Sequence, residues 1–303
     1  MEIEPISHIG AEVRAFGRLT QMTAREKGEL IEAFQDKHLL VLRGDIPVDD
    51  QIAVCRLFGS AIDEKSNGEL SYEMTNRVGV NASRGRLLFH SDHSYAPTPI
   101  GGISLYALEV PGDGSTTLFA NAERAWQIMP EALHDRLDRC LVCNVLDLDA
   151  KGDYGAPACR THPASHAQRA YHPVGLINPL TGRRVAYINE LSSEFVEGMS
   201  PSESAEIIET VGRYVYAAEN IYEHDWHVGD LVIWDNIALQ HARNDPALRG
   251  DAPDGGRTFR RVAFTVPDWS APTMSWYRAY NYRRAVEGKD RTVAHLAART
   301  TPK

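Results

Sequence analysis

The residues of this sequence best suited to chemistry are His90 and Asp92, which follow the apolar run Leu87-Leu88-Phe89. On an extended strand successive side chains point to opposite faces, so His90 and Asp92 share one face. An imidazole and a carboxylate supply two ligands of the facial triad that holds non-haem Fe(II), and a second imidazole completes it. A His-x-Asp pair is also common as a hydrogen-bonded strand end, so a third ligand must come from elsewhere.

The composition is that of a soluble globular protein, with 303 residues, 43% hydrophobic and 24% charged, and a net charge of −9. This charge argues against nucleic acid or an anionic membrane as a partner, because both favour dense patches of Lys and Arg. The acidic start Met1-Glu2-Ile3-Glu4-Pro5 lacks the apolar core of a signal peptide, and no apolar run approaches the roughly 20 residues of a membrane span. We therefore expect a cytoplasmic protein. The C-x-x-C pair Cys140 and Cys143 is expected to be two core thiols.

The first 60 residues predict an α/β lead-in. The capping box Thr23-x-x-Glu26 begins a helix that we expect over 23–37, and Leu39-Leu40-Val41-Leu42 is typical of a short buried strand. Pro47 leads into a second expected helix, which Gly59 ends.

From about residue 70 the pattern changes to short apolar strands with polar connections. We expect strands at 86–90, 102–108, 116–119, 139–146, 172–177, 184–188, 231–234 and 257–266. Many short strands indicate a sandwich or barrel. Two helices interrupt them, one near 121–137 and one that begins at the capping box of Ser200 and Glu203.

Residues 147–171 lie between these helices and are rich in Gly, Pro, Ala and His, with no apolar period. Loops this long inside compact domains are usually functional lids or disordered. We predict a lid over 150–170 rather than a second metal site at His162 and His166, because Pro163 opposes the helix that would bring the two histidines together.

A candidate third ligand, His241, lies far from the first pair in the sequence. Leu231-Val232-Ile233-Trp234 is typical of a buried strand, Asp235-Asn236 turns the chain, and His241 then stands at the start of another strand. Strands far apart in sequence can converge in a sandwich or barrel, which is where His241 would complete the site.

Two segments of the sequence contain the three candidate ligands: Phe89-His-Ser-Asp92 and Gly229-Asp-Leu-Val-Ile-Trp-Asp-Asn-Ile-Ala-Leu-Gln-His241. Together they resemble the taurine and phenoxyacetate dioxygenase (TauD/TfdA) family, whose members depend on Fe(II) and 2-oxoglutarate. Further segments match in the family's order at 10–13, 38–43, 114–119 and 172–182. The resemblance implies a mainly β chain with flanking helices, folded as a double-stranded β-helix (a jelly roll, cupin-like). It implies one domain over 1–303, with a lead-in at 1–60, a jelly-roll core with helical insertions at 61–268 and a C-terminal extension at 269–303.

Carried onto this sequence, the resemblance implies that His90, Asp92 and His241 bind the iron. It also implies that the hydroxyl of Thr117 contacts a carboxylate of 2-oxoglutarate. An arginine past the distal histidine, expected to be Arg257, would bind the cosubstrate's distal carboxylate, because guanidinium presents a planar fork to a carboxylate.

Strand alternation places Arg257 and Arg261 on one face and Arg260 on the other. We expect Arg261 to meet an anionic group of the substrate. Fifteen residues separate His241 from Arg257, a few more than is usual in the family, so it stays open which of the two inward arginines holds 2-oxoglutarate. We also assign Arg86 to the substrate site. Taurine-specific members of the family carry an amide residue at this position, so Arg86 argues against taurine as the substrate.

The resemblance implies a dioxygenase that uses Fe(II), 2-oxoglutarate and O2 and releases succinate and CO2. It would oxidise a small, anionic organic substrate by hydroxylation, desaturation or hydroxylative cleavage. Two alternatives are a hydrolase that holds Zn(II) in the same His/Asp/His set and a catalytically silent jelly-roll binding module. The sequence names neither the substrate nor the oligomeric state, for which a homo-oligomer stays open.

Overall fold

The computed structural model describes residues 1–75, 86–110, 115–146, 157–161, 167–243, 256–266 and 281. The chain divides into two compact units. Unit 1 comprises Met1–Arg86, Ile100–Phe119 and Ile221–Pro267, and unit 2 comprises Leu87–Pro99, Ala120–Asn220 and Asp268–Lys303. The single domain expected over 1–303 stays a prediction. Among the described helices, none is long and apolar enough to span a membrane.

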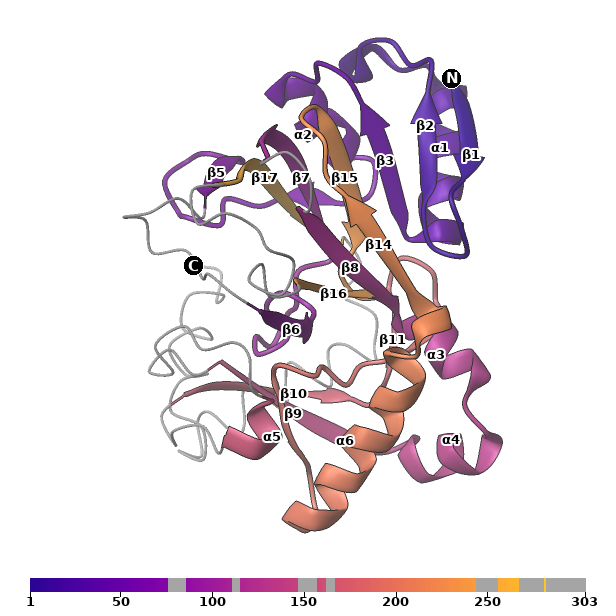
Figure 1. The fold of residues 1–303 in the computed structure, drawn as a ribbon, viewed down its shortest axis with the longest axis vertical. Coiled ribbons are helices and arrows are strands. Elements are labelled where there is room, and N and C mark those ends of the chain that lie inside the picture. The colour runs from indigo at the N-terminus through magenta and orange to yellow at the C-terminus, as the bar shows by residue number, and fades with distance from the viewer. Residues whose placement is uncertain are drawn as a thin grey trace, which may run out of the picture. The chain divides into compact units, whose positions relative to one another are not determined.

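The larger sheet of unit 1 has the order β1-β2-β3-β15-β7-β17-β4, and β5 also pairs with β17 (Figure 1). All its pairs are antiparallel except β2 with β3. Its strands are β1 (Glu2–Pro5), β2 (Ala11–Arg14), β3 (Leu39–Arg43), β4 (Ser60–Ala61), β5 (Tyr72–Thr75), β7 (Gly102–Glu109), β15 (Asp230–Asp235) and β17 (Thr258–Thr265). In the second sheet of this unit, β8 (Thr116–Asn121) lies between β14 (Ile221–Asp225) and β16 (Leu239–Arg243).

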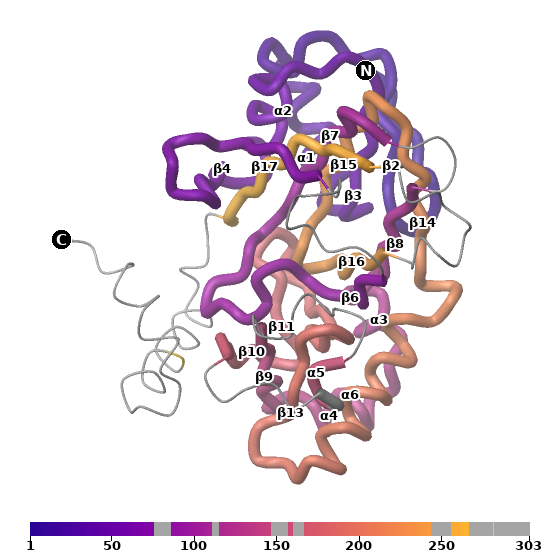
Figure 2. The backbone as a smooth tube through the Cα atoms, turned by 60° about the vertical axis from the view of Figure 1, so that its left-hand side comes forward, coloured from indigo at the N-terminus to yellow at the C-terminus, as the bar shows by residue number. Residues whose placement is uncertain are grey.

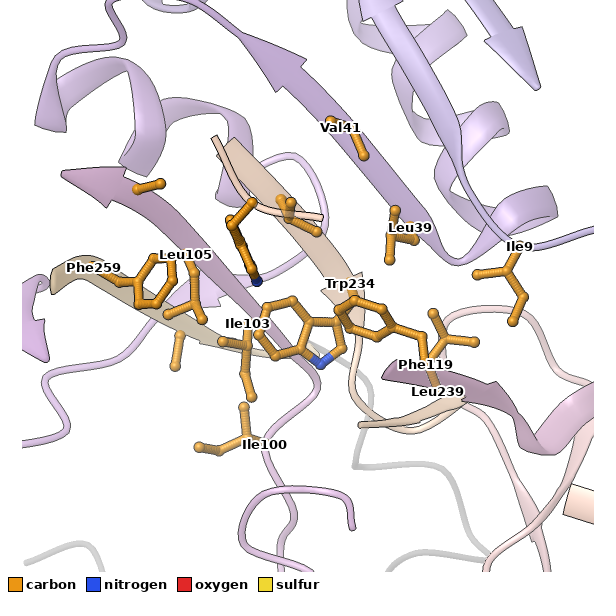
Figure 3. Close-up of a cluster of buried hydrophobic side chains, with 14 residues drawn as sticks. Ile9, Leu39, Val41, Ile100, Ile103, Leu105, Phe119, Trp234, Leu239 and Phe259 are labelled. Atoms are coloured by element: carbon orange, nitrogen blue, oxygen red, sulfur yellow. The ribbon is translucent and has the colours of Figure 1, made fainter. Parts of the chain in front are cut away.

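A hydrophobic core joins the two sheets of unit 1 (Figure 3). Trp234 of β15 meets Phe119 of β8 edge-on, with ring centroids 5.4 Å apart. Both side chains are fully buried, and burial of a large apolar side chain contributes about 1.5–3 kcal/mol. The cluster also contains Ile9, Leu39, Val41, Ile100, Ile103, Leu105, Ala107, Trp226, Val232, Leu239, Phe259 and Ala263.

The helices of unit 1 are α1 (Ala24–Lys37) and α2 (Val48–Cys55), with a short 3₁₀ turn at η1 (Leu19–Gln21). The capping box predicted for α1 is present, since the Thr23 side chain accepts the Glu26 N–H and the Glu26 carboxylate accepts the Thr23 N–H. The prediction that the second helix runs to Gly59 is wrong, because α2 ends at Cys55. Gly59 is instead required where β17 approaches, since a Cβ there would collide with the backbone oxygen of Thr265.

Unit 2 contains the antiparallel sheet β10-β9-β13 and the hairpin β11-β12, with helices beside them (Figure 2). Its strands are β6 (Leu87–His90), β9 (Leu141–Leu146), β10 (Gln168–Pro173), β11 (Gly175–Ile177), β12 (Arg184–Ala186) and β13 (Ser193–Val196). Its helices are α3 (Ala122–Ile128), α4 (Glu131–Leu137), α5 (Ala158–Thr161), α6 (Pro201–Val215) and the 3₁₀ turn η2 (Ala218–Asn220). The predicted capping box of α6 is present at Ser200 and Glu203.

Three expectations for unit 2 need correction. The single helix expected near 121–137 is two helices, since Pro130 cannot continue α3 and is the N-cap of α4. The strand expected over 172–177 is divided into β10 and β11. The thiol of Cys143 is buried in β9 as predicted, whereas Cys140 is only half-buried and precedes the strand.

Most of the predicted lid over 150–170, with His162 and His166, lies outside the described residues. Its last residues, 168–170, belong to β10 and pair with β9, so the lid prediction is wrong for this end of the segment. The extension expected at 269–303 is described only at Asn281, whose side-chain amide bonds the backbone N–H and carbonyl of Tyr171 at 2.9 and 3.1 Å.

Candidate metal centre

His90 ends strand β6, and a hydrogen bond defines which of its ring nitrogens faces the centre. Its Nδ1 lies 2.9 Å from the carbonyl oxygen of Leu88. A carbonyl only accepts, so Nδ1 carries the proton and Nε2 keeps its lone pair for a metal. Nε2 lies 3.1 Å from Oδ1 of Asp92, as the shared face predicted. Two ligand atoms bonded at about 2.1 Å and at right angles to one ion lie roughly 3.0 Å apart, so this spacing fits a shared cation.

His241 lies on β16, beside two aromatic side chains of the unit 1 core. Its ring centroid is 5.1 Å from that of Trp234, in an edge-on arrangement, and 6.5 Å from that of Phe119. These contacts limit the rotation of the imidazole. They therefore hold the ring in one orientation for a ligand.

His90 and Asp92 belong to unit 2, and His241, the proposed third ligand, belongs to unit 1. Two imidazoles and one carboxylate suit the facial triad of Fe(II), which leaves three positions for other ligands. Zn(II) accepts the same donors, so the donor set by itself does not separate the two metals.

Thr117 of β8 is buried, and its hydroxyl oxygen accepts a hydrogen bond from the Nε1–H of Trp226 at 2.9 Å. This bond occupies a lone pair of the hydroxyl oxygen and leaves its proton for another acceptor, such as a carboxylate. Sequence reasoning found Thr117 but missed Trp226, which has no motif of its own.

Arg257 directly precedes β17 and contacts Ser115 and Phe259. Its Nη1 donates to Oγ of Ser115 at 3.4 Å, and its guanidinium lies 5.5 Å from the ring centroid of Phe259. Burial, followed by the positive charge of Arg243, lowers the pKa of Arg257 to about 9. A carboxylate partner would raise this pKa, so the surroundings of Arg257 favour the arrival of an anion.

Arg243 is a candidate that sequence reasoning missed. It lies on β16 two positions after His241, so the two side chains share a face of the strand. Burial lowers the pKa of Arg243 as well. The available signal was this two-residue offset from a proposed ligand.

Arg261 is paired within unit 1. Its Nε and Nη2 each donate to a carboxylate oxygen of Glu64 at 2.9 Å, and the two side chains are only 7% and 10% exposed. Arg260 is on the opposite face of β17, where its Nε donates to Oε1 of Gln51 at 2.6 Å, so the predicted separation of Arg260 from Arg261 is confirmed. Arg86 is exposed just before β6. The substrate roles of Arg261 and Arg86 stay predictions.

Comparison with known proteins adds evidence along the whole chain. The family described as taurine catabolism dioxygenase TauD, TfdA family matches residues 2–263. The chain is 28% identical to pentalenolactone F synthase of Streptomyces arenae over 301 residues, which cover 90% of this chain and 98% of that protein. It is also 28% identical to the (S)-phenoxypropionate/alpha-ketoglutarate-dioxygenase of Sphingobium herbicidovorans over 225 residues, which cover 69% of this chain and 74% of that protein.

The solved structures include a taurine dioxygenase from Burkholderia xenovorans, with a TM-score of 0.70 and 20% sequence identity. The match covers 88% of this chain and 89% of that chain. A likeness at this identity establishes the fold, so the predicted mainly β jelly roll with flanking helices is confirmed.

Proposed function

Since this chain belongs to the taurine catabolism dioxygenase TauD, TfdA family, we propose that His90, Asp92 and His241 hold one Fe(II) ion. Family membership confirms the predicted enzyme class, an oxidoreductase that depends on 2-oxoglutarate, Fe(II) and O2. It favours this function over the Zn(II) hydrolase and the silent binding module. The observation that carries the assignment of the ligands is the 3.1 Å spacing of His90 Nε2 and Asp92 Oδ1, with the proton of His90 held on Nδ1 by the Leu88 carbonyl.

The bound iron would supply the chemistry that activates dioxygen, and the protein would supply binding and orientation. His90 binds through Nε2, because Leu88 holds the proton on Nδ1. Thr117 donates a hydrogen bond from its hydroxyl to one carboxylate of 2-oxoglutarate, and the indole N–H of Trp226 orients that hydroxyl. Arg257 binds the other carboxylate through its planar fork.

The substrate is a small organic molecule, and we propose that it carries an anionic group, as phenoxypropionate does in the named relative. Arg261 is the proposed partner of this group, with Arg86 as a further positive charge. The bidentate ion pair with Glu64 means that a substrate anion must share or displace that carboxylate. Selectivity would then favour anions with further contacts to the protein. The cytoplasmic location and a homo-oligomeric state also stay predictions.

Succinate formation tests the proposed function. Purified protein with Fe(II) and 2-oxoglutarate under air should release succinate slowly alone and faster with the right member of a panel of small organic anions. His241→Ala should release none. Zn(II)-supported hydrolysis without succinate formation would instead identify a hydrolase.

A further inference from the structure

The backbone on either side of His90 is fastened to a single short segment of unit 2. The N–H of Ser91 donates to Oδ1 of Asn189 at 2.5 Å. The N–H of Phe89 donates to a carboxylate oxygen of Glu190 at 3.2 Å, and its carbonyl accepts the N–H of Leu191 at 3.0 Å. Three consecutive residues therefore hold two alternate positions of the extended chain.

The hydrogen bond between the Ser91 N–H and Asn189 constrains the backbone next to both proposed ligands, His90 and Asp92. The N–H of Ser91 belongs to the peptide bond that joins it to His90, and Asp92 is the next residue along. Orienting this peptide limits the torsion angles on both sides of it, ψ of His90 and φ of Ser91. This hydrogen bond therefore contributes to the directions of both the imidazole and the carboxylate.

Asn189 is itself held by a chain of buried hydrogen bonds. Its N–H donates to Oγ of Ser193 at 2.8 Å, and the Ser193 hydroxyl donates to Oδ1 of Asn144 at 2.7 Å. Asn144 lies on β9, the central strand of its sheet, and all three residues are 0% exposed. The hydrogen bonds of this buried chain restrain its side chains, so the chain can transmit the position of the sheet to the ligand-bearing backbone.

One polar atom of the Asn189 side-chain amide is buried without a hydrogen bond to any described residue, so the amide stabilises the fold poorly. Its Nδ2 has no hydrogen-bond partner within the described part of the chain. A buried polar atom that lacks a bond costs about 1–3 kcal/mol, and an apolar side chain of the same shape avoids that cost. The amide oxygen of Asn189, in contrast, accepts the hydrogen bond from the Ser91 N–H.

We propose that Asn189 is a positioning residue for the metal centre, one whose amide oxygen orients the peptide between His90 and Asp92 so that both side chains reach the same ion. This inference rests on the proposed iron site. Outer partners of metal ligands typically contribute 10- to 100-fold to metal affinity.

The test compares two buried asparagines of unit 2. Asn189→Leu keeps the shape of the side chain and removes the acceptor. Asn220→Leu is the matched control, since Asn220 is equally buried but its amide donates to Asn121 O and Val215 O at 2.9 and 2.8 Å. Fe(II) is titrated anaerobically into each protein with saturating 2-oxoglutarate, and binding is followed by the metal-to-ligand absorption band.

We expect Asn189→Leu to weaken Fe(II) binding by about 10-fold or more, and Asn220→Leu to stay within about two-fold of the unsubstituted protein, although both lower the melting temperature. If Asn189→Leu does not fold, Asn189→Ser, whose hydroxyl is too short to reach Ser91, carries the same expectation. Equal Fe(II) affinity in the Asn189 and Asn220 variants would overturn the positioning role. No band in the unsubstituted protein would instead refute the iron site on which it rests.

Discussion

At the scale of single residues, Arg257, which precedes β17, and Arg261, which lies on it, differ in their electrostatic surroundings. Burial and the charge of Arg243 lower the pKa of Arg257, whereas Arg261 is already paired with the carboxylate of Glu64. A dicarboxylate at Arg257 would offset the effect of burial, whereas at Arg261 it would compete with Glu64. This contrast favours Arg257 for the cosubstrate, the assignment that the longer loop after His241 had left open.

Replacing each arginine should separate the two roles. Arg257→Ala should weaken 2-oxoglutarate binding to the iron-loaded protein by roughly 30-fold or more, because loss of one member of a buried charge pair costs about 2–5 kcal/mol. Arg261→Ala should leave that affinity nearly unchanged and weaken the primary substrate. The absorption band of the anaerobic Fe(II) complex measures the first effect. If Arg261→Ala is the variant that loses the band, the two roles are exchanged.

The proposed ligands should be individually essential. His90→Ala, Asp92→Ala or His241→Ala should abolish succinate formation, because each removes one of three protein ligands from the ion. The fold should persist in each variant, as circular dichroism can check, since the hydrophobic cluster of unit 1 contains none of these three side chains. His227→Ala, at an exposed histidine, is the control and should keep full activity. Full activity in His241→Ala would remove that residue from the centre.

At the scale of elements, helix α3 packs against the hairpin β11-β12 through a glycine. A Cβ at Gly175 of β11 would meet the indole ring of Trp126, and neither group has room to withdraw, since Trp126 is 8% exposed. The close approach of helix and strand therefore requires glycine at this position.

Two Gly→Ala substitutions should change stability in opposite directions. Gly175→Ala should lower the free energy of unfolding by about 1–3 kcal/mol through overpacking. Gly28→Ala in α1, where nothing lies within 4 Å of the new Cβ, should raise it by up to about 1 kcal/mol through helix propensity. Urea denaturation measures both. A stable Gly175→Ala protein would show that α3 can shift away from the hairpin.

At the scale of the whole molecule, a buried histidine makes folding sensitive to acid. His172 is fully buried, its Nε2–H donates to the carbonyl of Ala96 at 3.0 Å, and burial lowers its pKa to about 4. The unfolded chain takes up a proton at this residue below about pH 6.5, and the folded chain does not until about pH 4. Stability should therefore be intact above pH 6.5 and fall between pH 6.5 and 4.

From this group alone, the unfolding free energy should be about 2 kcal/mol smaller at pH 5 than at pH 7. His172→Gln, which keeps a neutral donor, should lack this part of the pH dependence. Urea unfolding of both proteins at the two pH values gives the difference directly. An identical pH dependence in the two proteins would show that His172 titrates normally in the folded state.

Local physics explains which features could be predicted from sequence. The capping boxes at Thr23 and Ser200 begin helices as expected, because each motif satisfies backbone donors with side chains three residues away. The alternation of β17 correctly separated Arg260 from Arg261, because side-chain direction along a strand depends only on neighbouring residues. The family and its fold followed from motifs that stand in order along the chain.

Contacts between distant segments were decided only by the tertiary structure. Nothing near Glu64 in the sequence points to Arg261, and nothing near Asn189 points to Ser91, because each pair meets through the packing of separate elements. Gly59 was taken as a helix end because the later strand that approaches it cannot be read locally. The sequence by itself determined the chemical identity of the candidate ligands. The tertiary structure decided which neighbouring groups orient them and which compensate the charges around them, because electrostatics and hydrogen bonding depend on proximity in space.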